Sequence, residues 1–386
     1  MTQFKYPNIL NEISDKFSSI NKNIYIVGGY CRDYFFWIQD SFSDIDLATD
    51  ALPSETEKLF PGSKNIWKKY WTIQICYKWF RFEVTTFRKD IGILDNRHPI
   101  EISFTDNIIE DANRRDFTIN AIYFNVRNHS WLDPVNGISD TKDKYINFIH
   151  NPSSRIQEDA LRILRYVRIK YKYGLIDPKT ENTDILRDNI GLLQYISIER
   201  IQEEFQQILS EKHQGDAIFY LNSINFFKQI YWVSIDKKYL DTFYQKHSSN
   251  LNIIISFALY MQWVSAANLK KLLWSKDTMI LSYLMKNFWI MKWYGGLEEV
   301  EKYKILSHKY CTILVNVLEI FLSDSESLEI VRTIKRDFNL YCLLKKKEAF
   351  QDWNNLKKTI GLVEGKSLWE KLKTINAGIL FWNKDL

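Results

Sequence analysis

Cysteine is scarce in this chain, with four residues among 386, and none of the four stands in a Cys-x-x-Cys pair. The missing pairs argue against a zinc site, and the low density argues against a scaffold held by disulfide bonds. The chain begins MTQFKYPNIL, without a basic stretch followed by an apolar run, and no membrane-spanning run is visible. We therefore expect a protein of the reducing cytoplasm.

A strong excess of charge of one sign is also missing. The net charge is +5, which permits a nucleic-acid partner without requiring one. There is no internal repeat, low-complexity tract or Pro/Gly-rich linker. Aromatic residues, in contrast, are frequent at 15%, and those outside the core can stack on bases. A chain of this length exceeds one ordinary core, so we expect several packed units that abut directly.

Apolar periodicity divides the chain into a mixed front and a helical rear. Residues 9–20 have helical spacing, whereas residues 24–27, 73–77 and 81–88 have the short runs or alternation of strands. After residue 153, long helical patterns dominate. The predicted fold class is therefore α+β, with an all-α region following an α/β head.

The most informative stretch reads VGGYCRDYFFWIQDSFSDIDLATD. Asp44 and Asp46 flank Ile45, and a strand would turn both carboxylates to one side. Two such carboxylates suit hard cations, and such a site can hold two metals for a phosphoryl transfer. Glu83, on the polar face of residues 81–88, is the candidate third carboxylate. The alternative for Glu83 is an exposed strand residue or an ion pair with a neighbouring arginine.

A Gly-Gly turn at Gly28 and Gly29 precedes these carboxylates. Its backbone N–H groups are free to face a phosphate, and Arg32, one turn into the following helix, can add a charge-assisted contact. Each feature alone has an ordinary explanation, such as a common turn or a solvated pair of Arg32 with Asp33. Their combination is much harder to obtain by chance and predicts a site for a metal and a phosphate.

Arginine-rich segments follow. Arg114 and Arg115 are adjacent, and adjacent guanidiniums repel unless an anion lies between them, for which a triphosphate is the obvious candidate. A solvated basic turn is the alternative.

Residues 158–168, EDALRILRYVR, predict a helix whose polar face carries Asp159 and Arg162. The alternative there is an ordinary amphipathic helix with an ion pair between these two residues.

A fixed pair of Asp159 and Arg162 would select bases. Cytosine and adenine both present an amino donor beside a ring-nitrogen acceptor, whereas guanine and uracil do not. Aspartate can only accept and arginine can only donate, so the pair matches C and A without a template.

These segments together resemble a known family. GGYCRD, DIDLATDALP, EVTTFR, RRDFTINAI, DPVNGISD and RIQEDALRILRYVR occur in the order and spacing of the CCA-adding tRNA nucleotidyltransferases of the bacterial and eukaryotic class. Bacterial poly(A) polymerases share nearly all of these motifs. The resemblance ends near Arg200. It implies a polymerase-β-like nucleotidyltransferase head at residues 1–148, a helical neck with a base-recognition helix at 149–212, and an all-helical body and tail that binds tRNA at 213–386.

The resemblance also implies roles for individual residues. Asp44 and Asp46 match the metal-binding aspartates of the family, and Asp159 and Arg162 match its base-reading pair. The remaining nucleotide-binding candidates are Gly28, Gly29, Arg32, Arg114, Arg115, Asn120, Arg165 and Arg168.

Two further segments bear on the resemblance. Residues 88–105 resemble the flexible loop that the family uses when it switches from C to A, which argues against an enzyme that adds only CC. Tyr30 and Cys31 depart from the small or β-branched residues usual in the family. We expect little effect, because both should face away from the ligand.

The expected activity is Mg²⁺-dependent, template-independent addition of CCA to the 3′ end of tRNA from CTP and ATP. Three alternatives remain open at this point: a bacterial-type poly(A) polymerase, an enzyme that adds only CC or only A, and a non-catalytic RNA-binding module. The presence of the metal and base ligands together argues against the last.

Overall fold

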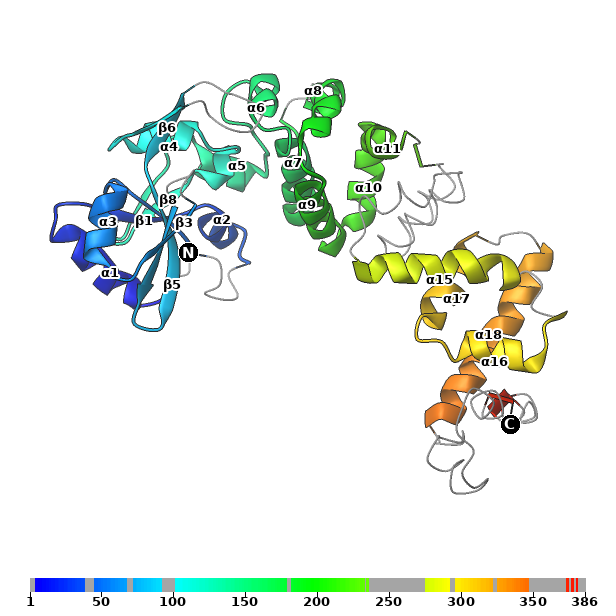
Figure 1. Cartoon of the computed structure of the whole chain (residues 1–386). Helices are drawn as coiled ribbons and strands as arrows, with labels where there is room; N and C mark the ends of the chain where they lie inside the picture. The colour runs from blue at the N-terminus through cyan, green and yellow to red at the C-terminus, as the bar shows by residue number, and fades with distance from the viewer. Residues whose placement is uncertain are drawn as a thin grey trace. The chain divides into compact units, whose positions relative to one another are not determined.

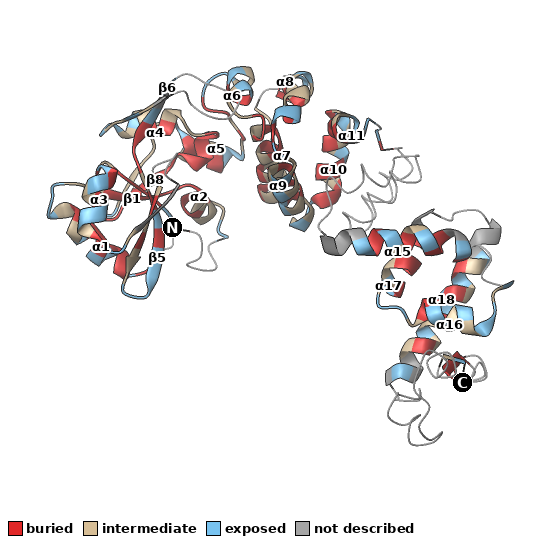
Figure 2. Ribbon diagram, viewed as in Figure 1, coloured by how far each residue is buried: buried red, intermediate tan, exposed pale blue. Residues whose placement is uncertain are grey.

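The computed structural model describes residues 4–38, 45–67, 72–91, 101–178, 182–232, 234–235, 275–291, 296–321 and 325–346, with residues 373, 374, 376, 377 and 380. It divides into two compact units, Met1–Ser234 and Ile235–Leu386. The first unit runs from blue to green in Figure 1 and the second from yellow to red. Each unit buries apolar residues of its own (Figure 2).

A mixed seven-stranded sheet forms the centre of the first unit, in the order β3-β4-β5-β2-β1-β8-β9. Its strands are antiparallel to their neighbours except β2 and β5, which are parallel. They are β1 (Ile24–Val27), β2 (Asp46–Thr49), β3 (Lys64–Trp67), β4 (Thr72–Tyr77), β5 (Phe80–Thr86), β8 (Tyr123–Asn125) and β9 (Ser130–Leu132). A separate antiparallel ribbon consists of β6 (Arg88–Ile91) and β7 (Glu101–Phe104). The strands predicted at 24–27 and 73–77 are confirmed.

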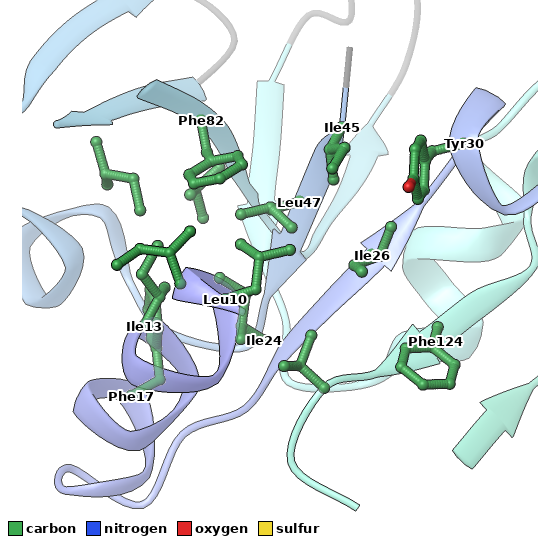
Figure 3. Close-up of a cluster of buried hydrophobic side chains, with 14 of the residues drawn as sticks. Leu10, Ile13, Phe17, Ile24, Ile26, Tyr30, Ile45, Leu47, Phe82 and Phe124 are labelled. Atoms are coloured by element: carbon green, nitrogen blue, oxygen red, sulfur yellow. The ribbon is translucent and has the colours of Figure 1, made fainter. Parts of the chain in front are cut away.

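Strand β1 is buried on both faces, which explains its unbroken apolar run. Ile24 and Ile26 point to one face, where they meet apolar residues of helix α1 (Ile9–Ser18), as Figure 3 shows. Tyr25 and Val27 belong to a second cluster on the opposite face. Because successive side chains of a strand alternate, a strand covered on both sides is apolar at every position. The other members of the second cluster are Ala48, Phe87, Ala112, Ala121, Tyr123 and Ile149.

Short helices border the sheet and carry several of the candidate residues. They are α2 (Gly29–Phe35), α3 (Pro53–Leu59), α4 (Ile108–Asn113), the 3-10 helix η1 (Thr118–Asn120) and α5 (Gly137–Asp143). Helix α5 approaches η1 closely through Gly137. A Cβ at this position would lie 2.2 Å from the carbonyl oxygen of Thr118, so only glycine permits the approach. This contact supports η1 and with it Asn120.

Helices complete the first unit from residue 152 onward. They are α6 (Pro152–Glu158), α7 (Arg162–Tyr173), α8 (Asn182–Asn189), η2 (Ile190–Tyr195), α9 (Ile198–Ser210), α10 (Gln214–Ser223) and α11 (Phe226–Tyr231). Helix α7 packs against α9 and α10, and most of its apolar stripe is completely buried. The predicted change from a mixed front to a helical rear is confirmed.

Residues 158–168 do not form one helix, so that prediction was wrong. Helix α6 ends at Glu158, and α7 begins at Arg162. Between them Asp159 has an extended backbone, with φ −150° and ψ 103°. Its Oδ1 accepts a hydrogen bond from the backbone N–H of Leu161 over 3.1 Å. Such a local bond competes with the helical hydrogen-bond pattern and favours a helix start, which is a known tendency of aspartate.

The second unit is helical in the ranges that are described. Its helices are α15 (Ser275–Met291), α16 (Glu299–Leu306), α17 (Cys311–Phe321) and α18 (Ser325–Lys346). Their buried residues include Leu284, Phe288, Leu306, Leu314, Leu318 and Ile334. None of the helices in the described parts of the chain is long and apolar enough to cross a membrane. The fold class, an α+β head followed by helices, is confirmed; the finer division after residues 148 and 212 stays a prediction.

Candidate active site

Two carboxylates stand in register on one face of the sheet. Asp46 begins β2 and Glu83 lies in β5, and the parallel pairing of these strands sets them opposite each other. Both residues are exposed, whereas the next residues, Leu47 and Val84, are buried in the core on the other face. Side chains that alternate along paired strands therefore turn both carboxylates to the same side. This is the placement that the predicted role of Glu83 requires.

The carboxylate face has the chemistry of a divalent-cation site. Hard cations prefer oxygen ligands, and Asp46 and Glu83 each supply a carboxylate. Among the residues that the structure describes, no set of three His, Cys, Asp or Glu residues could hold a metal. Asp44 lies outside the described residues, so its predicted place beside Asp46 stays a prediction.

The Gly-Gly turn lies against Asp46. Gly28 has φ +77°, a conformation that side chains disfavour, and it precedes the first turn of α2. A Cβ at Gly28 would stand 3.2 Å from Asp46 Oδ2, and a Cβ at Gly29 would stand 3.3 Å from Arg32 Nη2. Glycine at both positions therefore leaves room between the carboxylate and the guanidinium. Tyr30 and Cys31, the two unusual residues, are buried in the apolar core, as expected.

Arg32 is a buried cation with several partners. Its Nε and Nη2 donate to Asp33 Oδ1 over 3.2 and 2.9 Å, and its Nη1 donates to Asn120 Oδ1 over 2.6 Å. Nη2 also donates to the Tyr173 hydroxyl over 2.7 Å. The pair with Asp33 is thus real, but side-chain exposures of 9% and 25% make it largely buried rather than solvated.

Arg114 and Arg115 share a carboxylate of their own chain. Asp111 in α4 is completely buried, with Oδ1 2.6 Å from Arg114 Nη2 and Oδ2 3.1 Å from Arg115 Nη2. The Tyr123 hydroxyl donates to Oδ2 over 2.7 Å. The carboxylate of Asp111 therefore already relieves the repulsion between the two guanidiniums, so this repulsion by itself does not require a triphosphate. The alternative interpretation, a solvated basic turn, is also wrong. Two positive charges and one negative charge leave the group attractive to phosphate.

Asp111 is a functional candidate that the sequence reasoning missed. The available signal was its position three and four residues before the arginines, which is the spacing of neighbours on a helix. Burial by itself raises the pKa of this carboxyl, but the two guanidiniums outweigh burial and bring the pKa to about 2. The group is therefore ionised at neutral pH.

Replacement of Asp111 by asparagine is expected to lower the free energy of unfolding by about 3–5 kcal/mol, because it leaves two inward-facing guanidiniums without a counter-charge. Urea denaturation at pH 7 measures this loss, and Glu110→Gln, at a half-exposed residue of the same helix 3.8 Å from Lys89, should cost less than about 1 kcal/mol. Because the folded pKa is depressed, the Asp111 contribution is complete above about pH 4 and is lost as the pH falls towards 2. An equal loss in both variants would contradict this assignment.

Asp116 holds a third arginine. It is buried, and its Oδ2 lies 2.8 Å from Arg165 Nη2 while its Oδ1 accepts from the Asn120 side-chain amide over 2.9 Å. Burial raises the pKa of Asp116, but Arg165 and Asn120 outweigh it and the pKa is about 2. Asp116 is the main charge that raises the pKa of Arg165, and Asp46 contributes as well. The arginine cluster and the carboxylate face are therefore close enough to interact electrostatically.

Asp159 and Arg162 lie on either side of the break between α6 and α7, each with a partner other than the other. Asp159 Oδ2 is 3.1 Å from Nη2 of Arg200 in α9. Arg162 Nη1 donates to Glu158 Oε2 over 2.7 Å. The simple alternative, an ion pair of Asp159 with Arg162 on one regular helix, is therefore wrong. Side-chain exposures of 20% and 12% leave each partly accessible to a ligand.

Arg155 connects the two arginine regions. It is buried in α6, and its Nη2 donates to the backbone carbonyls of Arg114 and Arg115, both over 2.6 Å. Its Nη1 pairs with Glu158, the carboxylate that Arg162 also uses. The sequence reasoning missed Arg155, because nothing local distinguishes it from a solvated arginine.

Of the remaining candidates, Arg168 pairs with Glu204 of α9 over 2.7 Å. The predicted loop at 88–105 is described only in part: the ribbon β6–β7 covers its two ends, and residues 92–100 lie outside the described residues. The recorded contacts join Arg32, Asn120 and Arg165 through Asp116. A second set joins Arg114 and Arg115 to Arg162 through Arg155 and Glu158. That all the predicted residues form one site stays a prediction.

Fold and site together define a class. A mixed sheet with carboxylates in register on β2 and β5, a glycine turn beside Asp46, and arginines paired with the buried Asp111 and Asp116 are the features expected of a nucleotidyltransferase head. A family model agrees with this reading of the head, because the poly A polymerase head domain matches residues 24–147.

Individual relatives narrow the class. The CCA-adding enzyme of Staphylococcus saprophyticus is 32% identical over 262 residues, which are 67% of this chain and 64% of that enzyme. The chain therefore matches a little under two thirds of that relative's length. The Bacillus stearothermophilus CCA-adding enzyme in complex with CTP has a TM-score of 0.70 at 20% identity, covering 97% of this chain and 92% of that one. The Thermotoga maritima CCA-adding enzyme in complex with a tRNA has a TM-score of 0.71 at 18% identity, covering 97% and 90%.

At 20% and 18% identity the two solved structures show that the fold is shared. The evidence for similarity in sequence is the 32% identity with the enzyme of Staphylococcus saprophyticus. Residues 24–147 match the poly A polymerase head domain, and the resemblance of the chain to the CCA-adding enzymes is confirmed.

Proposed function

We propose that this chain is a CTP/ATP:tRNA nucleotidyltransferase that adds CCA to the 3′ end of tRNA without a template. The observation that carries the proposal is the in-register pair of Asp46 and Glu83, in a head that also holds arginines paired with the buried carboxylates Asp111 and Asp116. Further support comes from the relatives, which are CCA-adding enzymes, and from solved neighbours bound to CTP, ATP and tRNA.

In the proposed reaction the 3′ hydroxyl of the RNA attacks the α-phosphate of the bound nucleotide. The new O–P bond replaces the bond to the β-phosphate, and pyrophosphate leaves. Asp46, Glu83 and Asp44 would hold Mg²⁺, which when bound lowers the pKa of the hydroxyl and neutralises developing charge. Arg114 and Arg115 would bind the triphosphate with the positive charge that remains after pairing with Asp111.

Asp159 and Arg162 would read the base. Both lie where the backbone leaves α6 and enters α7, so their side chains are not confined to one regular helix. Asp159 pairs with Arg200, and its carboxylate oxygens can accept a hydrogen bond from the amino group of C or A. Residues 88–105 would help the site to adjust between C and A, in line with the resemblance.

The test is extension of a tRNA transcript that lacks CCA, with Mg²⁺ and each labelled nucleotide in turn. CTP incorporation, then ATP incorporation, and a stop after three nucleotides would support the proposal. A run of A residues without use of CTP would instead indicate a poly(A) polymerase. Arrest after CC, or addition only to a transcript ending in CC, would indicate one of the narrower enzymes. No incorporation with intact tRNA binding would indicate a non-catalytic module.

We propose further that the helices after residue 212 bind the body of the tRNA. Truncation of the chain at Ser234, the boundary of the first compact unit, is expected to weaken binding of whole tRNA by at least about tenfold while sparing CTP binding. Filter binding at several salt concentrations measures both quantities. A shallower salt dependence should accompany the loss, because phosphate contacts release counterions. Equal tRNA affinity of the two chains would refute a role of residues 235–386 in tRNA binding.

A cytoplasmic location belongs to the same proposal. All four cysteines are free in the structure, as expected for a reducing compartment.

A further inference from the structure

Tyr173, the last residue of α7, contacts Arg32 of α2. Its hydroxyl accepts a hydrogen bond from Arg32 Nη2 over 2.7 Å and donates one to Asp33 Oδ1 over 2.6 Å. The Tyr173 hydroxyl is therefore both acceptor and donor to the two members of one largely buried ion pair. Arg32 and Asp33 precede it by about 140 positions, so no local pattern in the sequence announces this contact.

The ring of Tyr173 adds a second restraint. The guanidinium carbon of Arg32 lies 4.7 Å from the ring centre, within the range of a cation–π contact. Phe36 stacks on the ring with centres 4.7 Å apart. Gly29 lies on another side of the guanidinium, where a Cβ would be only 3.3 Å from Nη2. The guanidinium is thus confined by a ring and by the backbone of the glycine turn.

The hydrogen-bond inventory of Arg32 shows how little freedom remains. A guanidinium has five N–H donors. Nε is used by Asp33, Nη2 by Asp33 and Tyr173, and one Nη1 donor by Asn120. One Nη1 donor is left for a ligand, so the orientation of the whole group decides whether this donor reaches a phosphate.

These contacts connect α2 to two positions along α7, Tyr173 and Arg165. Tyr173 makes the first link, and the second runs from Arg32 through Asn120 and Asp116 to Arg165. Arg165 and Tyr173 are eight positions apart on one helix, which is about 12 Å along its axis. Two links so far apart define the direction of α7 as well as its distance from α2.

We propose that Tyr173 is a positioning residue, which holds Arg32 in the orientation that contacts the triphosphate and couples it to the helix that carries Arg162. This inference rests on the proposed function, since it takes Arg32 to be a triphosphate contact. Tyr173 itself need not touch the nucleotide. Its effect should therefore appear in affinity for the triphosphate moiety and leave the choice of base unchanged.

The test uses the full chain with Tyr173→Phe, which keeps the ring and removes the hydroxyl, and Tyr173→Leu, which removes both. Tyr171→Phe is the matched control, because it removes a hydroxyl from the same helix at a residue that packs on Tyr220 instead. Binding of inorganic tripolyphosphate and of CTP is measured by titration calorimetry, and urea denaturation checks that each variant is folded.

We expect Tyr173→Phe to weaken binding of tripolyphosphate and of CTP by a common factor of roughly ten, the cost of unpairing one charged hydrogen bond. Tyr173→Leu should weaken both further, and Tyr171→Phe should change neither. The preference for CTP over UTP should stay constant in Tyr173→Phe. A purely structural role predicts lower stability with unchanged affinities in the folded protein, and that result would overturn the inference.

Failure of the proposed function gives a different result. A wild-type chain that binds tripolyphosphate but extends no tRNA would contradict the proposed activity. The role of Tyr173 would then still be decided by whether Tyr173→Phe weakens tripolyphosphate binding. A wild-type chain that extends tRNA and binds tripolyphosphate as tightly with phenylalanine as with tyrosine at 173 would contradict the inference alone. If wild type bound no tripolyphosphate, the inference would also fall, because Arg32 would have no phosphate to contact.

Discussion

Replacement of Asp46 by asparagine is expected to reduce nucleotide addition by on the order of 10³-fold or more, which is the scale of losing a main electrostatic contact in a transition state. Asparagine keeps the size of the side chain but removes the charge that a divalent cation requires. Since Asp46 is exposed at the start of β2, the fold should survive. Single-turnover extension of a tRNA transcript measures the rate, and tRNA affinity should stay within about twofold of wild type.

Glu83→Gln tests the second carboxylate of the same face. The register of β2 with β5 sets Glu83 opposite Asp46, so we expect a loss of similar order. Glu12→Gln provides the control, because Glu12 is an exposed carboxylate that pairs with Lys78 away from this face. Wild-type turnover in Asp46→Asn would end the metal assignment. A loss in Asp46→Asn together with normal turnover in Glu83→Gln would restrict the metal site to the aspartates.

Loss of base selection is the second large effect that we expect. Asp159→Ala should weaken CTP and ATP by about ten- to a hundredfold and narrow their advantage over UTP, since UTP and GTP do not present the amino donor that the carboxylate accepts. Arg162→Ala should act in the same direction by removing the donor to the ring nitrogen. The ratio of kcat/KM for the four nucleotides, measured on one transcript, is the decisive quantity.

The structure supplies a control for this experiment. Arg187→Ala removes an exposed arginine whose recorded partners are Asp184 and the Ser223 carbonyl rather than Asp159 or Arg162. It should leave all four ratios unchanged. Arg200→Ala removes the partner of Asp159 and should relax selection without removing either base contact. If Asp159→Ala and Arg162→Ala lower all four nucleotides by one common factor, the two residues have a structural role only.

The break between α6 and α7 illustrates how local chemistry can outweigh periodicity. The apolar spacing of residues 158–168 is helical, and Ile163, Leu164 and Val167 are indeed buried together in α7. Periodicity reports which side of a helix meets the core, but it is insensitive to a short interruption. The Asp159 side chain bonds to the Leu161 N–H, and this local competition ends one helix and starts another.

The partners of the arginines could not be predicted for a different reason. The pairs of Asp111 with Arg114 and Arg115 span one helical turn and were visible in principle. Arg32, in contrast, meets Asn120 and Tyr173, which are 88 and 141 positions away. Sequence identifies a cation at each of these positions, but only the packing of α7 beside α2 decides which groups compensate its charge.

By itself the sequence determined the features that depend on neighbours along the chain. The apolar run of β1, the glycine turn before α2 and the carboxylate spacing around Ile45 are all local patterns, because strand alternation, helix periodicity and turn geometry act over a few residues. The tertiary structure alone decided that Glu83 stands opposite Asp46 and that buried Asp111 shares two guanidiniums. Strand register and the desolvation of charge depend on which distant segments pack together, and no single stretch of sequence contains that information.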